Sequence, residues 1–170
     1  MRRECWELQY HKELLSLAKH ILRQDSTRPS QTALRRAVSS VYYALFHTMA
    51  QNGADLLIGK TKRSRSKHAW RQVYRGLEHS SARSACDNGE ILKKFPGSIQ
   101  NFGSFFVKMQ YARHNADYDP YATFTKSSVE AYITRAEEAI KSLEGASEKD
   151  RRAFCAYVLF KVRKQEAQKF

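Results

Sequence analysis

Apolar residues recur every three or four positions along most of this chain, and that spacing is the period of an α-helix. The segment 30–52 shows it most clearly, with a broad apolar face formed by Leu34, Ala37, Val38, Val41, Tyr42, Leu45, Phe46 and Met49. Seven glycines and three prolines in 170 residues are too few for the many tight turns of an all-β fold. We therefore expect an all-α fold, an antiparallel bundle of about five or six helices.

The expected helices follow one another with short breaks between them. They span about 4–22, 30–52, 66–79, 96–118, 127–145 and 147–168. Residues 80–96 have no clear period and are expected to form a loop with a short helical turn. No repeat or linker is visible, so residues 1–170 are expected to form a single domain. Its bundle core would cover about 8–145, and the basic helix at 147–168 would be an addition able to pack on a partner.

Glycine, proline and small hydroxyl residues mark the expected helix ends. Gly53 follows the most strongly periodic segment and suits a left-handed C-terminal cap. Pro120 disfavours helix at the residue before it, so a helix is expected to stop near 118. Two pairs have the spacing of N-terminal capping signals, namely Ser127 with Glu130 and Ser147 with Asp150.

Charge is the strongest global signal of function. Lysine and arginine number 30 against 17 aspartates and glutamates, which gives a formal net charge of +13. Such an excess attracts polyanions, because each phosphate contact releases condensed counterions. Nucleic acid is the first expected partner, and an acidic protein or an anionic lipid surface comes next. A merely solvated surface is the alternative.

Basic residues between 60 and 75 are the candidates for contacts with a nucleic-acid backbone. The run begins in an expected loop and continues onto the following helix. The alternative is a solvated loop without a partner. The candidate residues are Lys60, Lys62, Arg63, Arg65, Lys67, Arg71 and Arg75.

Several classes of site are not expected. Cys5, Cys86 and Cys155 are far apart and odd in number, which argues against a zinc site or a disulfide framework and predicts free thiols. No histidine lies three or four residues from another, and no glycine-rich phosphate loop is present, so neither a metal nor a cofactor is expected. Without an apolar leader or a run of about 18 apolar residues, the chain is expected to be cytoplasmic, with no membrane span.

Polar side chains gather in residues 113–120, at the end of an otherwise apolar helical segment that reads RHNADYDP. Helical spacing places Arg113 one turn from Asp117, and His114 one turn from Tyr118. The plain structural interpretation is an ion pair between Arg113 and Asp117, followed by a helix stop. The functional interpretation is a site of some kind, because a core-facing helix rarely ends in arginine, histidine, asparagine, aspartate and tyrosine together.

Two segments together carry a family resemblance. The first, LRRAVSSVYYALFH at 34–47, looks like the "RAYYAAFH"-type helix of small bacterial HEPN proteins (higher eukaryotic and prokaryotic nucleotide-binding), and RHNADYDP resembles their "RxxADYDP" segment. The order and separation of the two segments also fit, and the resemblance covers about residues 8–143. It implies a helical bundle, a homodimer and, in active members, a metal-independent ribonuclease centre of the kind found in toxins and phage defence.

The resemblance also implies roles for individual residues. Arg113 would bind the scissile phosphate, His114 takes the polar position, and Tyr118 stands where active members have histidine. A phenol, with an ordinary pKa of about 10, is a poor base near pH 7, so Tyr118 would donate a hydrogen bond to the phosphate or leaving group. Asp117 and Asn115 would orient Arg113. The alternatives are a non-catalytic module that binds nucleic acid or nucleotide, and an adaptor subunit with a cognate partner protein.

Overall fold

The structure is a computed structural model that describes residues 10–24, 28–61 and 63–160. These residues form eight α-helices and no strand, so the predicted all-α bundle is confirmed. The helices are α1 (Tyr10–Gln24), α2 (Gln31–Ile58), α3 (Lys67–Gly76), α4 (His79–Asp87), α5 (Gly89–Leu92), α6 (Gly97–Tyr118), α7 (Lys126–Gly145) and α8 (Glu148–Leu159).

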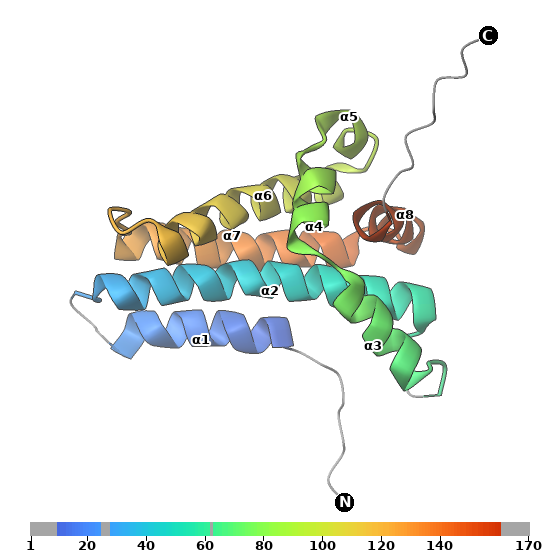
Figure 1. Ribbon diagram of the computed structural model, residues 1–170, viewed down its shortest axis with the longest axis horizontal. Coiled ribbons are helices and arrows are strands. Elements are labelled where there is room, and N and C mark those ends of the chain that lie inside the picture. Colours follow the sequence, from blue (N-terminus) through green and yellow to red (C-terminus); the bar gives the residue numbers. More distant parts are fainter. Residues whose placement is uncertain (1–9, 25–27, 62, 161–170) are drawn as a thin grey trace, which may run out of the picture.

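The long helix α2 is the centre of the bundle. Figure 1 shows α1 along one side of it and α7 along the other, while α3, α4 and α8 gather toward its C-terminal end. Because α1, α3, α6, α7 and α8 all pack on α2, its apolar side chains are buried on several sides. Tyr42 is an example, since its ring packs on Phe106 of α6 with 5.5 Å between ring centroids. Each such buried side chain contributes on the order of 2 kcal/mol to stability.

The predicted C-terminal cap at Gly53 is wrong. Gly53 lies inside α2, which continues to Ile58 and is stopped by Gly59 with a φ of 128°. The reason for a glycine at 53 is the close approach of α8, because a Cβ there would lie 3.1 Å from Cδ1 of Leu159. The sequence indicated that position 53 requires a glycine. It could not show whether the reason is the end of the helix or the close packing of a second helix.

The expected loop at 80–96 is also wrong, because α4 and α5 occupy most of it. Ala82 and Cys86, four residues apart, bury one face of α4, and Leu92 of α5 is buried as well. Gly103 of α6 has no side chain to obstruct them, and a Cβ there would lie 3.0 Å from Leu92. Packing against α6 therefore stabilises α4 and α5. Their serine and asparagine residues have low helix propensity, which made these helices difficult to predict from the sequence.

Helix starts agree better with the sequence. The side chains of Ser30, Ser66 and Ser147 each accept the backbone N–H expected of an N-cap. The capping box of α7 is formed by Thr125 and Ser128 instead of the predicted Ser127 and Glu130.

The third helix ends at Gly76, earlier than predicted, and the chain begins α4 at His79. The predicted stop before Pro120 is confirmed, since α6 ends at Tyr118.

The structure describes the predicted C-terminal basic helix only as α8, which ends at Leu159 with Phe160 as its cap. Phe154 and Val158 of α8 belong to the main hydrophobic core. The predictions for 4–9, for the break at 25–27, for Lys62 and for 161–168 lie outside the described residues. Within the described residues, no helix combines the length and the apolar character needed to cross a bilayer.

Candidate functional site

A polar line runs along α2 where it borders the C-terminal end of α6. Its members are spaced four residues apart, so they follow one ridge of the helix. Each member has a polar partner on another segment of the chain. The four are Arg35, Ser39, Tyr43 and His47.

Arg35 ties the end of α6 to α2, a role that the sequence did not predict. Its Nη1 donates to the carbonyl of Ala116 at 3.1 Å and to that of Asp119 at 2.8 Å. Its Nη2 donates to the carbonyls of Pro120 at 3.2 Å and Ala122 at 2.6 Å. The last carbonyls of a helix have no partner within the helix, so this one guanidinium fixes both the helix end and the turn after it.

The Arg113 guanidinium lies between a carboxylate and a phenol. Its Nε is 2.6 Å from Oδ2 of Asp117, the predicted ion pair, although the N–H is not aligned for a hydrogen bond. Its Nη2 donates to the Tyr43 hydroxyl at 3.2 Å. Oδ1 of Asp117 in turn accepts a hydrogen bond from the Ser39 hydroxyl at 2.6 Å. Two side chains of α2 therefore hold the pair in one position.

Aromatic rings surround the same guanidinium. The Cζ atom of Arg113 is 5.5 Å from the ring centroid of Tyr118, 5.6 Å from that of Tyr43 and 5.9 Å from that of Tyr42. Burial lowers the pKa of Arg113, but Tyr43, Asp117 and Tyr118 outweigh burial and raise it above its usual value, so the group stays charged. The side chain is 23% exposed. Nη1 has no hydrogen-bond partner among the residues the structure describes.

The other predicted site residues lie at the exposed edge of this cluster. Tyr118 is 64% exposed, and its ring centroid is 5.1 Å from that of His114. His114 and Asn115 are also exposed. In the described part of the chain, no hydrogen bond joins either side chain to Arg113, so the predicted orienting role of Asn115 has no contact behind it.

Two histidines that the sequence did not assign to the site lie beside Tyr43. Nδ1 of His79, at the start of α4, is 2.6 Å from the Tyr42 hydroxyl, and its ring stacks on Phe46 with 4.0 Å between centroids. Nδ1 of His47 is 2.7 Å from the Tyr74 hydroxyl. The ring centroids of His79 and His47 are 6.0 Å and 6.2 Å from that of Tyr43. Their positions in the sequence, far from residue 113, carried no signal of this proximity.

Burial and charge keep both imidazoles neutral near pH 7. Burial lowers the pKa of His79, and Arg113 lowers it further. Burial also lowers the pKa of His47, with smaller contributions from His79 and His11. Burial raises the pKa of Tyr42, so its hydroxyl stays protonated. The cluster therefore combines a fixed cation with neutral imidazoles, which can accept a proton.

The residues of the predicted basic surface differ in their burial and in their contacts. Arg65 is half-buried, lies 3.7 Å from Asp55 and stacks over the Trp70 ring at 4.7 Å, so it fixes the loop before α3. Lys62 is outside the described residues. Exposed cations remain at Lys60, Arg63, Lys67, Arg71 and Arg75. A hollow of about 620 Å³ on α3 is lined by His68, Arg71, Gln72, Arg75 and Gly76.

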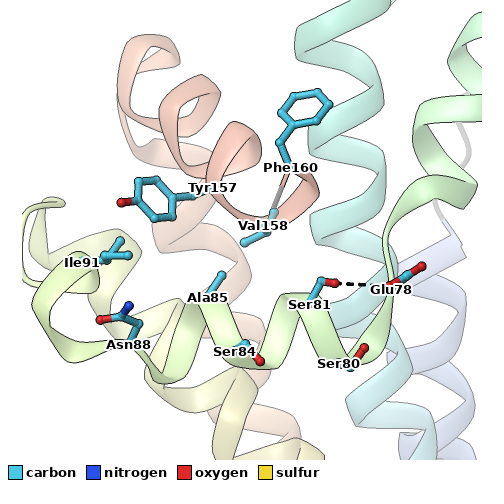
Figure 2. Close-up of a pocket in the computed structure, with 10 residues that line it drawn as sticks. All are labelled: Glu78, Ser80, Ser81, Ser84, Ala85, Asn88, Ile91, Tyr157, Val158 and Phe160. Atoms are coloured by element: carbon cyan, nitrogen blue, oxygen red, sulfur yellow. Dashed lines mark hydrogen bonds between the residues drawn. The ribbon is translucent and has the colours of Figure 1, made fainter. Parts of the chain in front are cut away.

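A second hollow, of about 500 Å³, lies between α4 and α8 (Figure 2). Figure 2 shows Ser80, Ser81 and Ser84 along α4, with Tyr157 on α8 and Phe160 directly after it, and the Ser81 hydroxyl donates to Glu78 at 3.3 Å. Its described lining contains a carboxylate and no cation, so it suits an uncharged group better than a phosphate.

No group of three or more histidine, cysteine, aspartate or glutamate side chains in the described residues could hold a metal ion. Cys86 and Cys155 are free and buried. Comparisons with protein-family models, with curated proteins and with solved structures found no match. The chemistry of the site therefore has to be inferred from its own residues.

Proposed function

We propose that this protein acts on RNA and that Arg113 holds a backbone phosphate, the role implied by the resemblance to HEPN proteins. The observation that carries the proposal is the state of the Arg113 guanidinium. It is charged, partly exposed and fixed on its Nε and Nη2 sides, while Nη1 has no partner among the described residues. An arginine held in this way needs little reorganisation to bind a phosphate oxygen.

The aromatic side chains beside Arg113 favour a nucleic acid over a free anion. Tyr118 is largely exposed and lies within cation–π distance of the guanidinium. Bases of a single strand stack on such exposed rings, at about 1–3 kcal/mol for each base. Phosphate bound to Arg113 and a base on Tyr118 would together select a nucleotide chain.

Asp117 does not prevent this role. Its carboxylate lies on the Nε side of the guanidinium and also accepts a hydrogen bond from Ser39. A carboxylate held from both sides orients the arginine more than it competes for Nη1. The net charge of +13 supplies the longer-range attraction for a polyanion.

The basic surface of α3 lies on a helix that contacts the aromatic neighbours of the site, which supports the proposal. Tyr74 of α3 is hydrogen-bonded to His47, whose ring stacks on Tyr43. Arg71 and Arg75 of the same helix are exposed and line its hollow. A strand with one phosphate at Arg113 could continue onto this surface, which would add salt-dependent affinity without sequence specificity.

A metal-independent ribonuclease and a non-catalytic RNA-binding module are both consistent with this arrangement. Tyr118, at the position where active family members carry histidine, favours the non-catalytic module because a phenol is a poor base near pH 7. Five further statements stay predictions of the sequence. They are membership of the HEPN family, a toxin or phage-defence setting, a homodimer, a cognate partner protein and a cytoplasmic location.

Binding of labelled single-stranded RNA, measured by fluorescence anisotropy, tests the proposal. Arg113→Ala is expected to weaken binding roughly tenfold or more, since a charged hydrogen bond contributes about 1.5–3 kcal/mol. Arg36→Ala is the matched control, because Arg36 is an exposed arginine of α2 and its loss removes the same charge. Equal weakening by the two substitutions would reduce Arg113 to one surface charge among many and overturn the proposal.

A further inference from the structure

We propose that His79 is the catalytic imidazole of the Arg113 site and transfers the proton when RNA bound there is cleaved. This inference rests on the proposed function, because it requires an RNA phosphate at Arg113. It goes further by assigning catalysis to a residue outside the segment 113–120. That assignment would remove the difficulty raised by Tyr118.

The imidazole and the guanidinium flank the same pair of tyrosine rings. The Tyr42 ring centroid is 5.7 Å from the His79 ring centroid and 5.9 Å from Cζ of Arg113. The Tyr43 ring centroid is 6.0 Å from the His79 ring centroid and 5.6 Å from Cζ of Arg113. The imidazole and the guanidinium therefore lie against the same two rings, and the proposal requires that the ribose 2′-hydroxyl beside a phosphate on Arg113 reach Nε2 of His79.

His79 is held in place on one side and open on the other. The Tyr42 hydroxyl lies at Nδ1, the Phe46 ring stacks on the imidazole, and Gln110 donates to the backbone carbonyl of His79 at 3.3 Å. Nε2 has no hydrogen-bond partner among the described residues, and the residue is exposed. Catalytic imidazoles are typically oriented through one ring nitrogen and work with the other.

The Tyr42 hydroxyl lets the imidazole act as either base or acid. When Nδ1–H donates to the Tyr42 oxygen, Nε2 carries a lone pair and can accept a proton. Once Nε2 has taken up a proton, the imidazolium keeps its Nδ1–H on the Tyr42 oxygen and can return the proton from Nε2 as an acid. Tyr42 is buried, so its hydroxyl stays with His79 in both states.

The proposed reaction begins with transfer of the ribose 2′-hydroxyl proton to Nε2 of His79. The 2′-oxygen then forms a bond to phosphorus, and the bond from phosphorus to the 5′-oxygen of the next nucleotide breaks. That oxygen takes a proton from water or from Tyr118. The products are a 2′,3′-cyclic phosphate and a 5′-hydroxyl, and Arg113 stabilises the charge that develops on the phosphoryl oxygens.

The groups around His79 favour its neutral form. Tyr42, Tyr43 and His47 face it from α2, and Arg113 is the charged group from α6. Burial and Arg113 both lower the pKa of His79, so the base form prevails near pH 7.

His47 is less suited to the role. It is half-buried where His79 is exposed, and the Tyr10 ring packs against it with 4.7 Å between centroids.

The test measures RNA cleavage and RNA binding on the same full-length variants, in chelator at neutral pH. His79→Gln is expected to lose cleavage by roughly 100-fold or more, the usual contribution of a general base, and to bind RNA as the unmodified protein does. His20→Gln is the matched control, because His20 is exposed on α1, and it should cleave normally. Free imidazole should restore cleavage to His79→Gly, a rescue that a structural role would not permit.

The outcomes separate this inference from the proposed function. Cleavage that survives His79→Gln, or an unmodified protein that binds RNA through Arg113 without cleaving it, would overturn the catalytic assignment and leave the binding proposal standing. RNA binding that does not depend on Arg113 would overturn both. Loss of cleavage without rescue by imidazole would overturn the role of His79 as a proton-transfer residue.

Discussion

The Arg113 site and the basic surface of α3 both present positively charged arginines, but only the first is fixed by neighbouring side chains. Arg113 is held by Asp117 and Tyr43, while Arg71 and Arg75 are exposed at the surface. The first setting fixes where a phosphate can sit, and the second only raises the local attraction for one. The difference teaches that net charge predicts affinity for polyanions, whereas chemistry requires cations held in place by neighbours.

Replacing Arg113 by lysine should give the largest effect, because it keeps the charge and removes the planar fork. The cleavage proposed for the Arg113 and His79 site is expected to fall by about 10²–10³, the usual cost of losing one donor to a developing oxyanion. Single-turnover cleavage of labelled RNA in chelator measures this. A lysine variant with full activity would show that charge alone is sufficient and would erase the contrast with α3.

Arg35→Ala should give the next effect, on stability. Four carbonyl acceptors lose one charged donor, and two of those hydrogen bonds are partly buried, so the free energy of unfolding is expected to fall by about 2–3 kcal/mol. Urea unfolding followed by circular dichroism measures it. Arg36→Ala, the neighbouring exposed arginine, should change stability by less than about 0.5 kcal/mol. Similar losses in the two variants would contradict the role given to Arg35.

A double substitution, Arg71→Gln with Arg75→Gln, sharpens the other side of the comparison. RNA affinity at physiological salt is expected to weaken by roughly tenfold, and the slope of log K against log salt to decrease by about 1.4. Cleavage of RNA already bound should not change. Binding titrations over a range of salt concentrations measure the slope, and an unchanged slope would mean that α3 does not contact the phosphates.

The smallest expected effect is a pH dependence of stability that comes from the buried histidines. His11 is 7% exposed, and burial lowers its pKa below 6.5, with Glu144 opposing this effect and Lys12 adding to it. Since the unfolded chain binds the proton more tightly, stability is full above pH 6.5 and is lost as the pH falls through the lower folded pKa. Thermal unfolding from pH 7.5 to 5 should show a falling Tm, less steeply in His11→Gln. An unchanged slope in that variant would remove His11 from the effect.

The sequence predicted the helical elements where apolar period and capping agreed, and failed where packing decided. Ser147 and Pro120 marked helix ends because their effects are local. Gly53 misled because its reason is a side chain of α8, more than a hundred residues away. α4 was missed because its stability comes from burial against α6, which no local pattern reveals.

The candidate site was predicted in part for the same reason. The Arg113 and Asp117 pair is local to one helix, so its spacing was sufficient. Arg35, Ser39 and His79 reach the site only through the packing of α2, α4 and α6. The four-residue spacing of the polar line on α2 was visible in the sequence, but nothing in the sequence showed that the C-terminal end of α6 packs beside it.

The measurement that tests the central claim most directly is the ¹⁵N resonance of the Arg113 side chain during titration with a short RNA, assigned by its loss in Arg113→Lys. If Arg113 holds a phosphate, this resonance should shift in step with binding, at RNA concentrations where Arg36 does not respond. A saturated complex in which the Arg71 and Arg75 resonances shift while that of Arg113 stays in place would contradict the claim.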